Sequence, residues 1–566
     1  MMSDTAKQLI LLNLLLILTV ILSFRFYGTE EVENSSATNT QARHSNGQIF
    51  LVGTAEQTPS GKTMISSREI AQPKRLTLPE FPPISMRIRS HGTGYYLSGI
   101  HAQRQNDWKT AHFYFDIVIA RDPDNLDLRR RAMVVAMGAG NLEAAARHAD
   151  VLLESETDDP LGLLFSAIYK FKNDQPSDAL AILEKMPQSG ISDFTLPLLT
   201  LWINASEGDL SAHNLRPDPI HAHHVALASN LLDEPKTAEE FLGILKSHIG
   251  AHPYMKLGDT LFALGQKELA LEMYHRLLAT HHGEDDALQM RLEAIQSDLP
   301  PPYSTPINVQ QGAALALLDL ARILYSQDSL DSARIYTRLS LALWDDLAEA
   351  RLLMAQIHRS GNRHTAAADE FEKIPTNSPY YASAIFEIVK IKDAIGEQKQ
   401  AIEVLNKLAD HPQALEAQIM KGNLYRRNKA YEKALASYDT AIKTIEASAT
   451  SDQPDFWEVY FMRGITHDKL GNWTAAEEDT VKALGYQPNH PHILNFLGYG
   501  WAKRGMNLHR SLEYLERAHS IKPEDSAIMD SLGWALFKLE RYDEALGMLE
   551  QAIMYSPYNA EINEHL

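Results

Sequence analysis

The residues best placed to do chemistry are histidines gathered near the middle of the chain. His221 and His224 are three residues apart, so a helix would bring both imidazoles to one face, as two zinc ligands require. No carboxylate stands beside them at matching spacing, and the pattern is none of the metalloprotease motifs. The alternative is that they are polar residues in a loop and at a helix start. We therefore predict no metal site here; the other histidines of the region are His213, His223, His281 and His282.

No other motif indicates catalysis. The chain contains no cysteine, which excludes disulfides, thiolate nucleophiles and cysteine-ligated zinc or iron–sulfur sites. It also lacks a phosphate-cradling glycine motif and a nucleophile elbow. The acidic pairs Asp158–Asp159 and Asp345–Asp346 fall in predicted turns, where such residues start helices. The sequence therefore predicts a protein that is not an enzyme and holds no cofactor.

The charge balance limits the partners. The chain of 566 residues has 53 basic and 73 acidic residues and a net charge of −20. A nucleic-acid partner would need a basic stripe, so this class of partner is excluded. The hydrophobic share of 45% suits a folded chain, and we expect proteins or peptides, rather than a small-molecule substrate, as partners.

One pattern recurs about every 34 residues between Ala417 and Leu566. Each period has a glycine, then a small, a large and a second small residue, and then a proline. Glycine and alanine remove bulk where two antiparallel helices touch, the large residue fills the space, and proline ends the second helix. One such pair cannot bury its apolar face alone, so the pairs must stack. The residues are Gly422, Gly464, Gly498 and Gly533; Ala434/Tyr438/Ala441, Ala476/Thr480/Ala483 and Ala545/Leu549/Ala552; and Pro488, Pro523 and Pro557.

This pattern resembles the tetratricopeptide repeat (TPR), whose glycine, aromatic, alanine and proline positions these residues match. Gly99, Ala111, Phe115 and Pro123 start the same pattern near the N-terminus. The resemblance covers about residues 91–566 and is strongest to TPR proteins of Gram-negative bacteria. It implies an all-α fold, a TPR-type α-solenoid coiled as a right-handed superhelix, and protein binding, with no substrate or reaction.

In TPR solenoids the first helix of each pair lines the concave surface, where ligands usually lie. Transferring that face by phase predicts a groove in which aromatic side chains beside amides and charges hold an extended peptide or a partner helix. The alternative is that Tyr499 and Trp534 pack between helices and touch nothing else. The carboxylate-clamping subtype is not matched, because Ile419 replaces its lysine. The predicted groove residues are Asn423, Arg426, Arg427, Phe461, Ile465, Asn495, Tyr499, Lys503, Asp530, Trp534 and Lys538.

An apolar run at the N-terminus, Leu9–Phe24, predicts a membrane-spanning signal anchor. A cleaved signal peptide would need small residues just after the run, where Phe24 and Tyr27 stand instead; a buried helix is the third alternative. A lipoprotein is excluded by the missing cysteine. Lys7 precedes the span, although Arg25 follows it, and the positive-inside rule then favours an inner-membrane, single-pass protein with a periplasmic array.

The rest of the chain divides by composition. A Ser-, Thr- and Pro-rich tether is predicted to be disordered, and its one apolar island, Ile49–Val52, is either a docking strand or unstructured. The prolines around Leu299–Pro306 predict a stiff spacer, or alternatively a polyproline ligand. The chain stops at Leu566 inside a first helix, so we expect either a truncation or a covered last helix. The predicted segments are the anchor 1–28, linker 29–90, N-terminal array 91–298, break 299–312 and C-terminal array 313–566.

The sequence thus predicts a membrane-tethered, non-enzymatic scaffold of the bacterial envelope that binds protein partners. Two alternatives remain open. One is a cytoplasm-facing adaptor on the inner membrane, similar to the TPR regulators of lipopolysaccharide synthesis, whose cysteine-ligated metal domain is missing here. The other is the TPR binding portion of a larger enzyme or polysaccharide-export machine.

Overall fold

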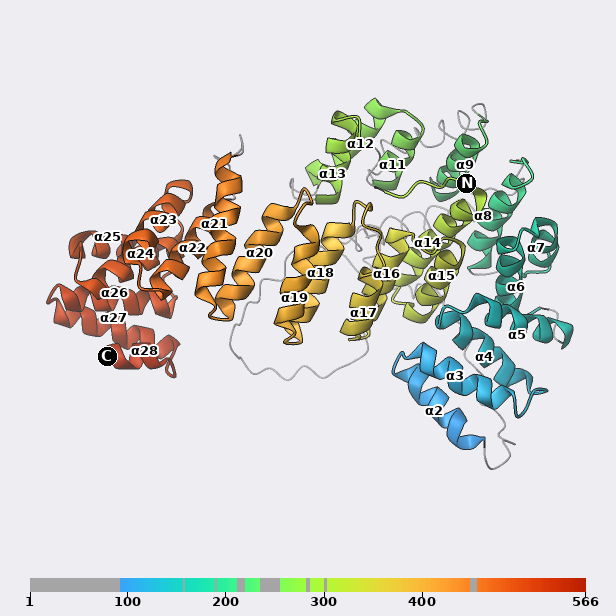
Figure 1. Cartoon of the computed structure of the whole chain (residues 1–566), viewed down its shortest axis with the longest axis horizontal. Coiled ribbons are helices and arrows are strands. Elements are labelled where there is room, and N and C mark those ends of the chain that lie inside the picture. Colours follow the sequence, from blue (N-terminus) through green and yellow to red (C-terminus); the bar gives the residue numbers. More distant parts are fainter. Residues whose placement is uncertain are drawn as a thin grey trace, which may run out of the picture. The chain divides into compact units, whose positions relative to one another are not determined.

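The structure, a computed structural model, describes residues 92–155, 158–188, 191–210, 219–234, 255–280, 286–299, 303–447 and 456–566. Every regular element in these ranges is helical, and they contain no strand. The chain divides into two compact units, Met1–Pro379 (unit 1) and Tyr380–Leu566 (unit 2). The all-α solenoid of stacked helix pairs is therefore confirmed (Figure 1).

The helices of unit 1 are α2 (Thr93–Arg104), α3 (Trp108–Ile119), α4 (Leu126–Gly138), α5 (Leu142–Ser155), α6 (Pro160–Lys172), α7 (Pro176–Leu183), α8 (Ser192–Ala205), α9 (Pro219–Leu231), α11 (Met255–Ala263), α12 (Lys267–Thr280), α13 (Asp286–Gln296), α14 (Val309–Ser326), α15 (Leu330–Leu343), α16 (Ala348–Ser360) and α17 (His364–Phe371). Those of unit 2 are α18 (Tyr381–Ala394), α19 (Gln398–Leu405), α20 (Ala414–Arg427), α21 (Tyr431–Ala447), α22 (Trp457–Lys469), α23 (Trp473–Tyr486), α24 (Pro491–Arg504), α25 (Leu508–Ile521), α26 (Ser526–Lys538), α27 (Tyr542–Tyr555) and α28 (Ala560–His565).

Each repeat glycine of unit 2 lies where its two helices touch, as the sequence predicts. A Cβ at Gly422 would stand 2.5 Å from the ring of Tyr438, which is far closer than two carbons can approach. Tyr438 is fully buried, so its ring fills the space that the missing side chain leaves. The same close approach joins Gly464 to Thr480, Gly498 to Leu515 and Gly533 to Leu549, at 2.6 to 2.7 Å.

Helix starts follow the predicted use of aspartate only in part. Asp159 begins α6, and its carboxylate accepts a hydrogen bond of 2.8 Å from the backbone N–H of Gly162. Asp345 and Asp346, by contrast, lie in the turn before α16, whose N-cap is Leu347 without a side-chain cap. The turn residue that caps a helix is set by its backbone position, and a neighbouring carboxylate one or two residues away cannot reach the same N–H groups.

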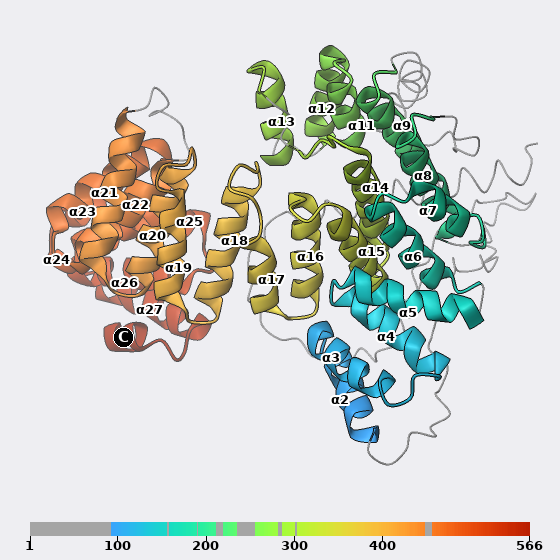
Figure 2. The ribbon, with the colours of Figure 1, turned by 45° about the vertical axis from the view of Figure 1, so that its right-hand side comes forward.

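The face formed by the first helices α4, α6 and α8 of unit 1 is covered by α14 and α15 of the same chain (Figure 2). Helix α14 contacts α8 and α9, while α15 contacts α4 and α6. Gly312 on α14 sits directly on Trp202, because a Cβ there would be 2.2 Å from the indole ring. The hydroxyls of Thr195 and Tyr336, on α8 and α15, lie 3.1 Å apart in a buried hydrogen bond. Apolar residues of all these helices form one continuous core.

The proline-rich break therefore does not coincide with the division into compact units, which falls at Pro379 instead of at 299–312. The described residues of the break form hydrogen bonds with elements that precede it and elements that follow it. The Tyr303 hydroxyl donates to the Asp259 carbonyl at 2.6 Å, and the N–H and hydroxyl of Ser304 both donate to the Glu349 carboxylate at 2.7 Å. These bonds lead the chain back onto unit 1, so that α14 returns to the core of the array that precedes the break.

The predicted anchor 1–28, the linker 29–90 and the island at 49–52 lie outside the described residues, as do His213, His281 and His282. Among the helices that the structure does describe, none combines the length and the apolar character needed to cross a bilayer.

Substituting Gly312 tests the seating of α14. Gly312→Ala should lower the melting temperature, because its methyl would overlap the fully buried indole of Trp202 and overpacking of this kind costs about 1–3 kcal/mol. Gly547→Ala is the control: Gly547 also lies in a helix, but a Cβ there meets nothing within 4 Å, so better helix propensity should raise the melting temperature slightly. Circular dichroism melts decide. A rise for Gly312→Ala equal to that of the control would contradict the contact.

Candidate protein-binding face

Three of the predicted groove residues gather around α28 at the end of unit 2. The Tyr499 hydroxyl, on α24, donates to the Glu561 carboxylate at 2.7 Å. On α26, the Asp530 carboxylate lies 2.9 Å from His565 Nδ1, and the Trp534 ring stacks on the His565 ring with centroids 4.3 Å apart. Successive first helices therefore meet through these side chains, so part of each aromatic surface is used for packing. Glu561 and His565 were not among the predicted residues.

Cations flank the same aromatic rings. The ammonium of Lys503 lies 5.7 Å from the centroid of Tyr499, and that of Lys538 lies 4.6 Å from the centroid of Trp534, both within cation–π range. Phe537 stacks on Trp534 at 5.4 Å and keeps 43% of its surface exposed. We call Tyr499, Lys503, Trp534, Phe537 and Lys538 the aromatic–cation patch. Phe537 was missed, although its place three residues after Trp534 on a helix already puts the two side by side.

The earlier predicted residues do not join this patch. Asn423 accepts a hydrogen bond of 2.6 Å from Tyr438 of its own repeat, and Arg427 pairs with Asp393 at 2.6 Å. Phe461 is buried in the core. The remaining three, Arg426, Ile465 and Asn495, are half-buried on α20, α22 and α24. Asn423 and Phe461 thus contribute to packing, whereas Arg427 keeps 55% of its side chain exposed.

Several polar atoms on the first helices are closed off from solvent without a hydrogen-bond partner among the described residues. They include Asn495 Oδ1, Trp534 Nε1 and Arg426 Nε. Leaving such an atom unsatisfied costs about 1–3 kcal/mol. Burial also raises the pKa of Asp530, although His565 opposes the shift, and burial followed by the nearby Glu561 raises the pKa of Tyr499. The face therefore carries polar groups that its own helices only partly satisfy.

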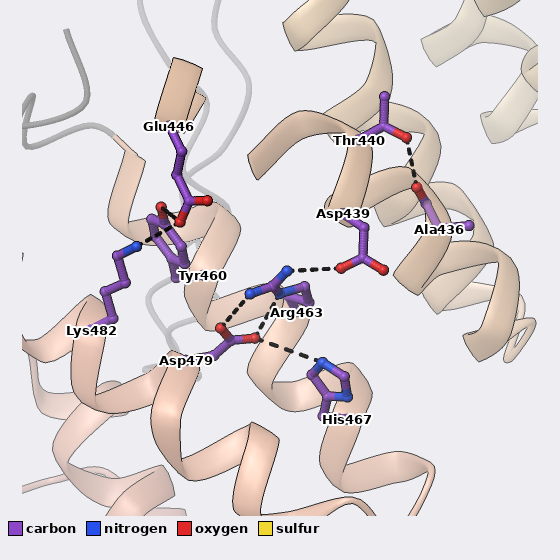
Figure 3. A network of polar contacts seen from close by, with 9 residues as sticks. All are labelled: Ala436, Asp439, Thr440, Glu446, Tyr460, Arg463, His467, Asp479 and Lys482. Carbon is purple, nitrogen blue, oxygen red and sulfur yellow. Dashed lines mark hydrogen bonds and ion pairs between the residues drawn. The ribbon is translucent and has the colours of Figure 1, made fainter. Parts of the chain in front are cut away.

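A network of charged groups joins α21, α22 and α23 (Figure 3). The Arg463 guanidinium donates to Asp479 through Nε and Nη2, at 2.8 and 2.7 Å, and to Asp439 through Nη1 at 2.8 Å. Burial lowers the pKa of Arg463, but the two carboxylates outweigh it and raise the pKa above its ordinary value. Beside it, Lys482 pairs with Glu446 at 2.8 Å. Each charge in this network has its partner, so the network sets the spacing of successive repeats and offers no free nucleophile.

A second ion cluster, on α15 to α17 of unit 1, holds an acidic group with a strongly lowered pKa. Glu370 accepts hydrogen bonds from Arg338 at 3.2 Å and from Arg351 at 2.7 Å. Burial raises the pKa of Glu370, but the charges of Arg338, Arg351 and Lys373 outweigh it and lower the pKa to about 2. Nearby, burial and then the charges of several arginines lower the pKa of His358 to about 3. Ion pairing and burial account for these shifts, so they do not indicate an active site.

A carboxylate joins the histidine region in the fold, but in an arrangement that does not favour a metal. His223, His224 and Asp319 are buried with their possible ligand atoms within 4.8 Å of one another. Trp202 Nε1 can only donate, and it donates to His224 Nδ1 at 3.2 Å. The proton of a neutral His224 must then be on Nε2, which lies 3.3 Å from Asp319. That nitrogen has no lone pair left for a metal, and His221, the predicted partner of His224, is not part of the group.

Stacked helix pairs with glycine contacts define this chain as a helical-repeat solenoid. Comparison with known families identifies the repeat: residues 96–160 and 399–454, 254–281, and 526–553 match three family models, each described as Tetratricopeptide repeat. The chain contains tetratricopeptide repeats, and this repeat class is an architecture of protein-interaction scaffolds.

One curated relative and several solved structures are similar to the chain. A TPR repeat-containing protein of Pseudomonas aeruginosa is 23% identical over 462 residues, which cover 78% of this chain and 71% of the relative. The crystal structure of the APC/C hetero-tetramer Cut9–Hcn1 matches with 16% identity and a TM-score of 0.31, covering 79% of this chain and 97% of that one. PilW, a type IV pilus biogenesis factor, matches with 18% identity and a TM-score of 0.32, covering 38% of this chain and 97% of its own.

The pKa of His358 predicts how stability depends on pH. The unfolded chain binds a proton at this histidine near the ordinary pKa of 6.5, whereas the folded chain does so only near 3. Stability from this group is therefore present above pH 6.5 and is lost as the pH falls toward 3, by at most about 1.4 kcal/mol per pH unit. His358→Gln should lose less stability over this interval than the unchanged protein in urea unfolding. His364→Gln, at an exposed position, should keep the original slope; equal slopes for all three proteins would refute the assignment.

Proposed function

We propose that this chain is a non-enzymatic scaffold that binds protein partners through the first-helix face of unit 2. The observation that carries the proposal is that α14 and α15 cover the corresponding face of unit 1 along α4, α6 and α8. In a solenoid the first-helix face is the usual ligand surface. A partner cannot use the part of this face formed by α4, α6 and α8 without displacing a buried core that includes Trp202 and Tyr336. On the same face, unit 2 carries the aromatic and cationic side chains of the aromatic–cation patch.

A row of basic side chains runs along that face. The residue five positions after each repeat glycine is basic in four consecutive repeats: Arg427, Lys469, Lys503 and Lys538. Lys469 and Lys503 are exposed, and Lys503 and Lys538 also belong to the aromatic–cation patch. Basic side chains beside half-exposed aromatic rings favour an extended peptide with carboxylates and an apolar or aromatic residue. Such a partner would also bring polar groups to a face whose own polar atoms are incompletely bonded.

The proposal extends to the place of the scaffold in the cell. The apolar run Leu9–Phe24 supports an inner-membrane anchor, with Lys7 on its cytoplasmic side. The repeats would then lie in the periplasm of a Gram-negative cell, tethered by the polar segment at 29–90. A tether of this composition lets the repeat region search for partners near the membrane.

Charge reversal on the basic row tests the binding face. Lys469→Glu with Lys503→Glu should weaken the binding of a partner, first identified by crosslinking in the native membrane, by at least about tenfold. Lys399→Glu with Lys443→Glu changes the net charge equally at exposed positions on the second helices α19 and α21 and should leave the affinity unchanged. Titration of purified partner and full chain measures both constants. Equal losses for the two pairs would show that only net charge matters and would exclude this face.

Protease treatment of spheroplasts tests the orientation. If the repeats face the periplasm, added protease should cut the region 91–566 in intact spheroplasts, because no membrane then shields it. A cytoplasmic protein of the same cells serves as the control and should be cut only after lysis. Protection of the repeats until lysis would place them in the cytoplasm.

A further inference from the structure

A cavity of about 690 Å³ lies on unit 1 between α3, the α4–α5 turn, α6 and α15. Its volume falls in the range of roughly 300–1,000 Å³ that is typical of small-molecule sites. Lys109 lines it from α3, Asn141 from the turn, Lys172 from the end of α6 and Arg338 from α15. Because α15 follows α6 only after a long stretch of sequence, the cavity forms only when α15 is docked on the N-terminal helices.

The lining of this cavity is cationic although the chain as a whole is acidic. Lys109, Lys172, Arg338 and Arg351 contribute four positive charges, and the only carboxylates of the lining are Glu143 and Asp345. The excess of two positive charges contrasts with the net charge of −20 for the chain. Lys109 and Lys172 are exposed, and neither ammonium forms an ion pair with any residue that the structure describes.

The arginines of the cavity are incompletely neutralised. Arg338 and Arg351 share the single carboxylate of Glu370, which also accepts Lys373 at 3.2 Å. Nε of Arg338 is buried and has no hydrogen-bond partner within the described ranges. The side chain of Arg338 runs along Gly140, where a Cβ would lie 3.5 Å from its Cδ. The guanidinium therefore lies against a backbone turn in the wall of the cavity, where Nη2 donates to Glu370 and Nε is closed off from solvent.

We propose that this cavity binds a small multivalent oxyanion, carried by phosphate or carboxylate groups. Two ammonium groups without an ion pair among the described residues supply mobile point charges, and the Arg338 guanidinium in the cavity wall supplies a fixed, planar positive charge that attracts such oxygens. His112 and Asn141, whose side chains are 3.3 Å apart, add neutral polar groups at the rim. Since the lining comes from α3, α6 and α15 together, the bound anion joins α15 to the N-terminal helices and stabilises unit 1. This site is separate from the proposed protein-binding face on unit 2.

Calorimetric titration of the full chain at low ionic strength tests the site, with pyrophosphate and citrate as probes. We expect saturable binding of at least one probe, together with a higher melting temperature. Binding of pyrophosphate alone assigns a phosphate ligand, and binding of citrate alone assigns a polycarboxylate. Either outcome supports the site. Lys109→Gln with Lys172→Gln should weaken that binding by at least about tenfold, and because both side chains are exposed the variant should keep its helicity.

A matched pair of substitutions separates this cavity from general charge effects. Lys399→Gln with Lys443→Gln removes the same charge from exposed positions of unit 2 and should bind the probe as the unchanged chain does. The proposal is overturned if neither probe binds saturably, or if the two pairs weaken binding equally.

Discussion

Close approach of paired helices at residues without side chains is the constraint on which the rest of this structure depends. Within a repeat, Gly422 receives the ring of Tyr438 and Gly533 receives Leu549. Between repeats the same device recurs, because a Cβ at Gly500 would lie 2.0 Å from the ring of Trp473. These contacts let the helix axes approach closely, and they fix the position in which each repeat packs on the next.

The same kind of contact makes the two units different. In unit 1, the missing side chain of Gly312 leaves room for the ring of Trp202 on α8. Helix α14 therefore packs on the first-helix face that a partner would otherwise contact. Thr195 and Tyr336 then close a hydrogen bond inside the core, where water cannot compete and a lost partner would be costly. This face of unit 1 therefore packs against helices of the same chain. In unit 2, the aromatic–cation patch retains exposed groups, although α28 takes part of the surface of Tyr499 and Trp534.

The two units also differ in how completely their clustered charges are paired. The Arg463 network of unit 2 satisfies each of its charges and spaces neighbouring repeats. The ion cluster of unit 1 has more cations than its central carboxylate, Glu370, can neutralise. This excess depresses the pKa of His358, after burial, and it continues into the cavity beside α15. Burying more positive than negative charge costs desolvation free energy, and a bound anion would offset that cost.

The amino-acid sequence by itself determined the repeat, its helix pairs and the contacts of Gly422, Gly464, Gly498 and Gly533. These features follow from a local period that each repeat carries in its own residues. It also placed Tyr499, Asp530 and Trp534 on one face, because that position follows from helical phase. The membrane anchor was proposed on the same kind of local evidence and stays a prediction, since it lies outside the described residues.

Only the tertiary structure decided what those faces touch. The return of α14 and α15 to unit 1 rests on contacts such as that between Thr195 and Tyr336, which are 141 positions apart. The cavity beside Arg338 likewise joins residues with no common period. A repeat pattern fixes how neighbouring helices stack, but it carries no information on which distant helix will fill a face, because that depends on shape and charge assembled from several repeats at once.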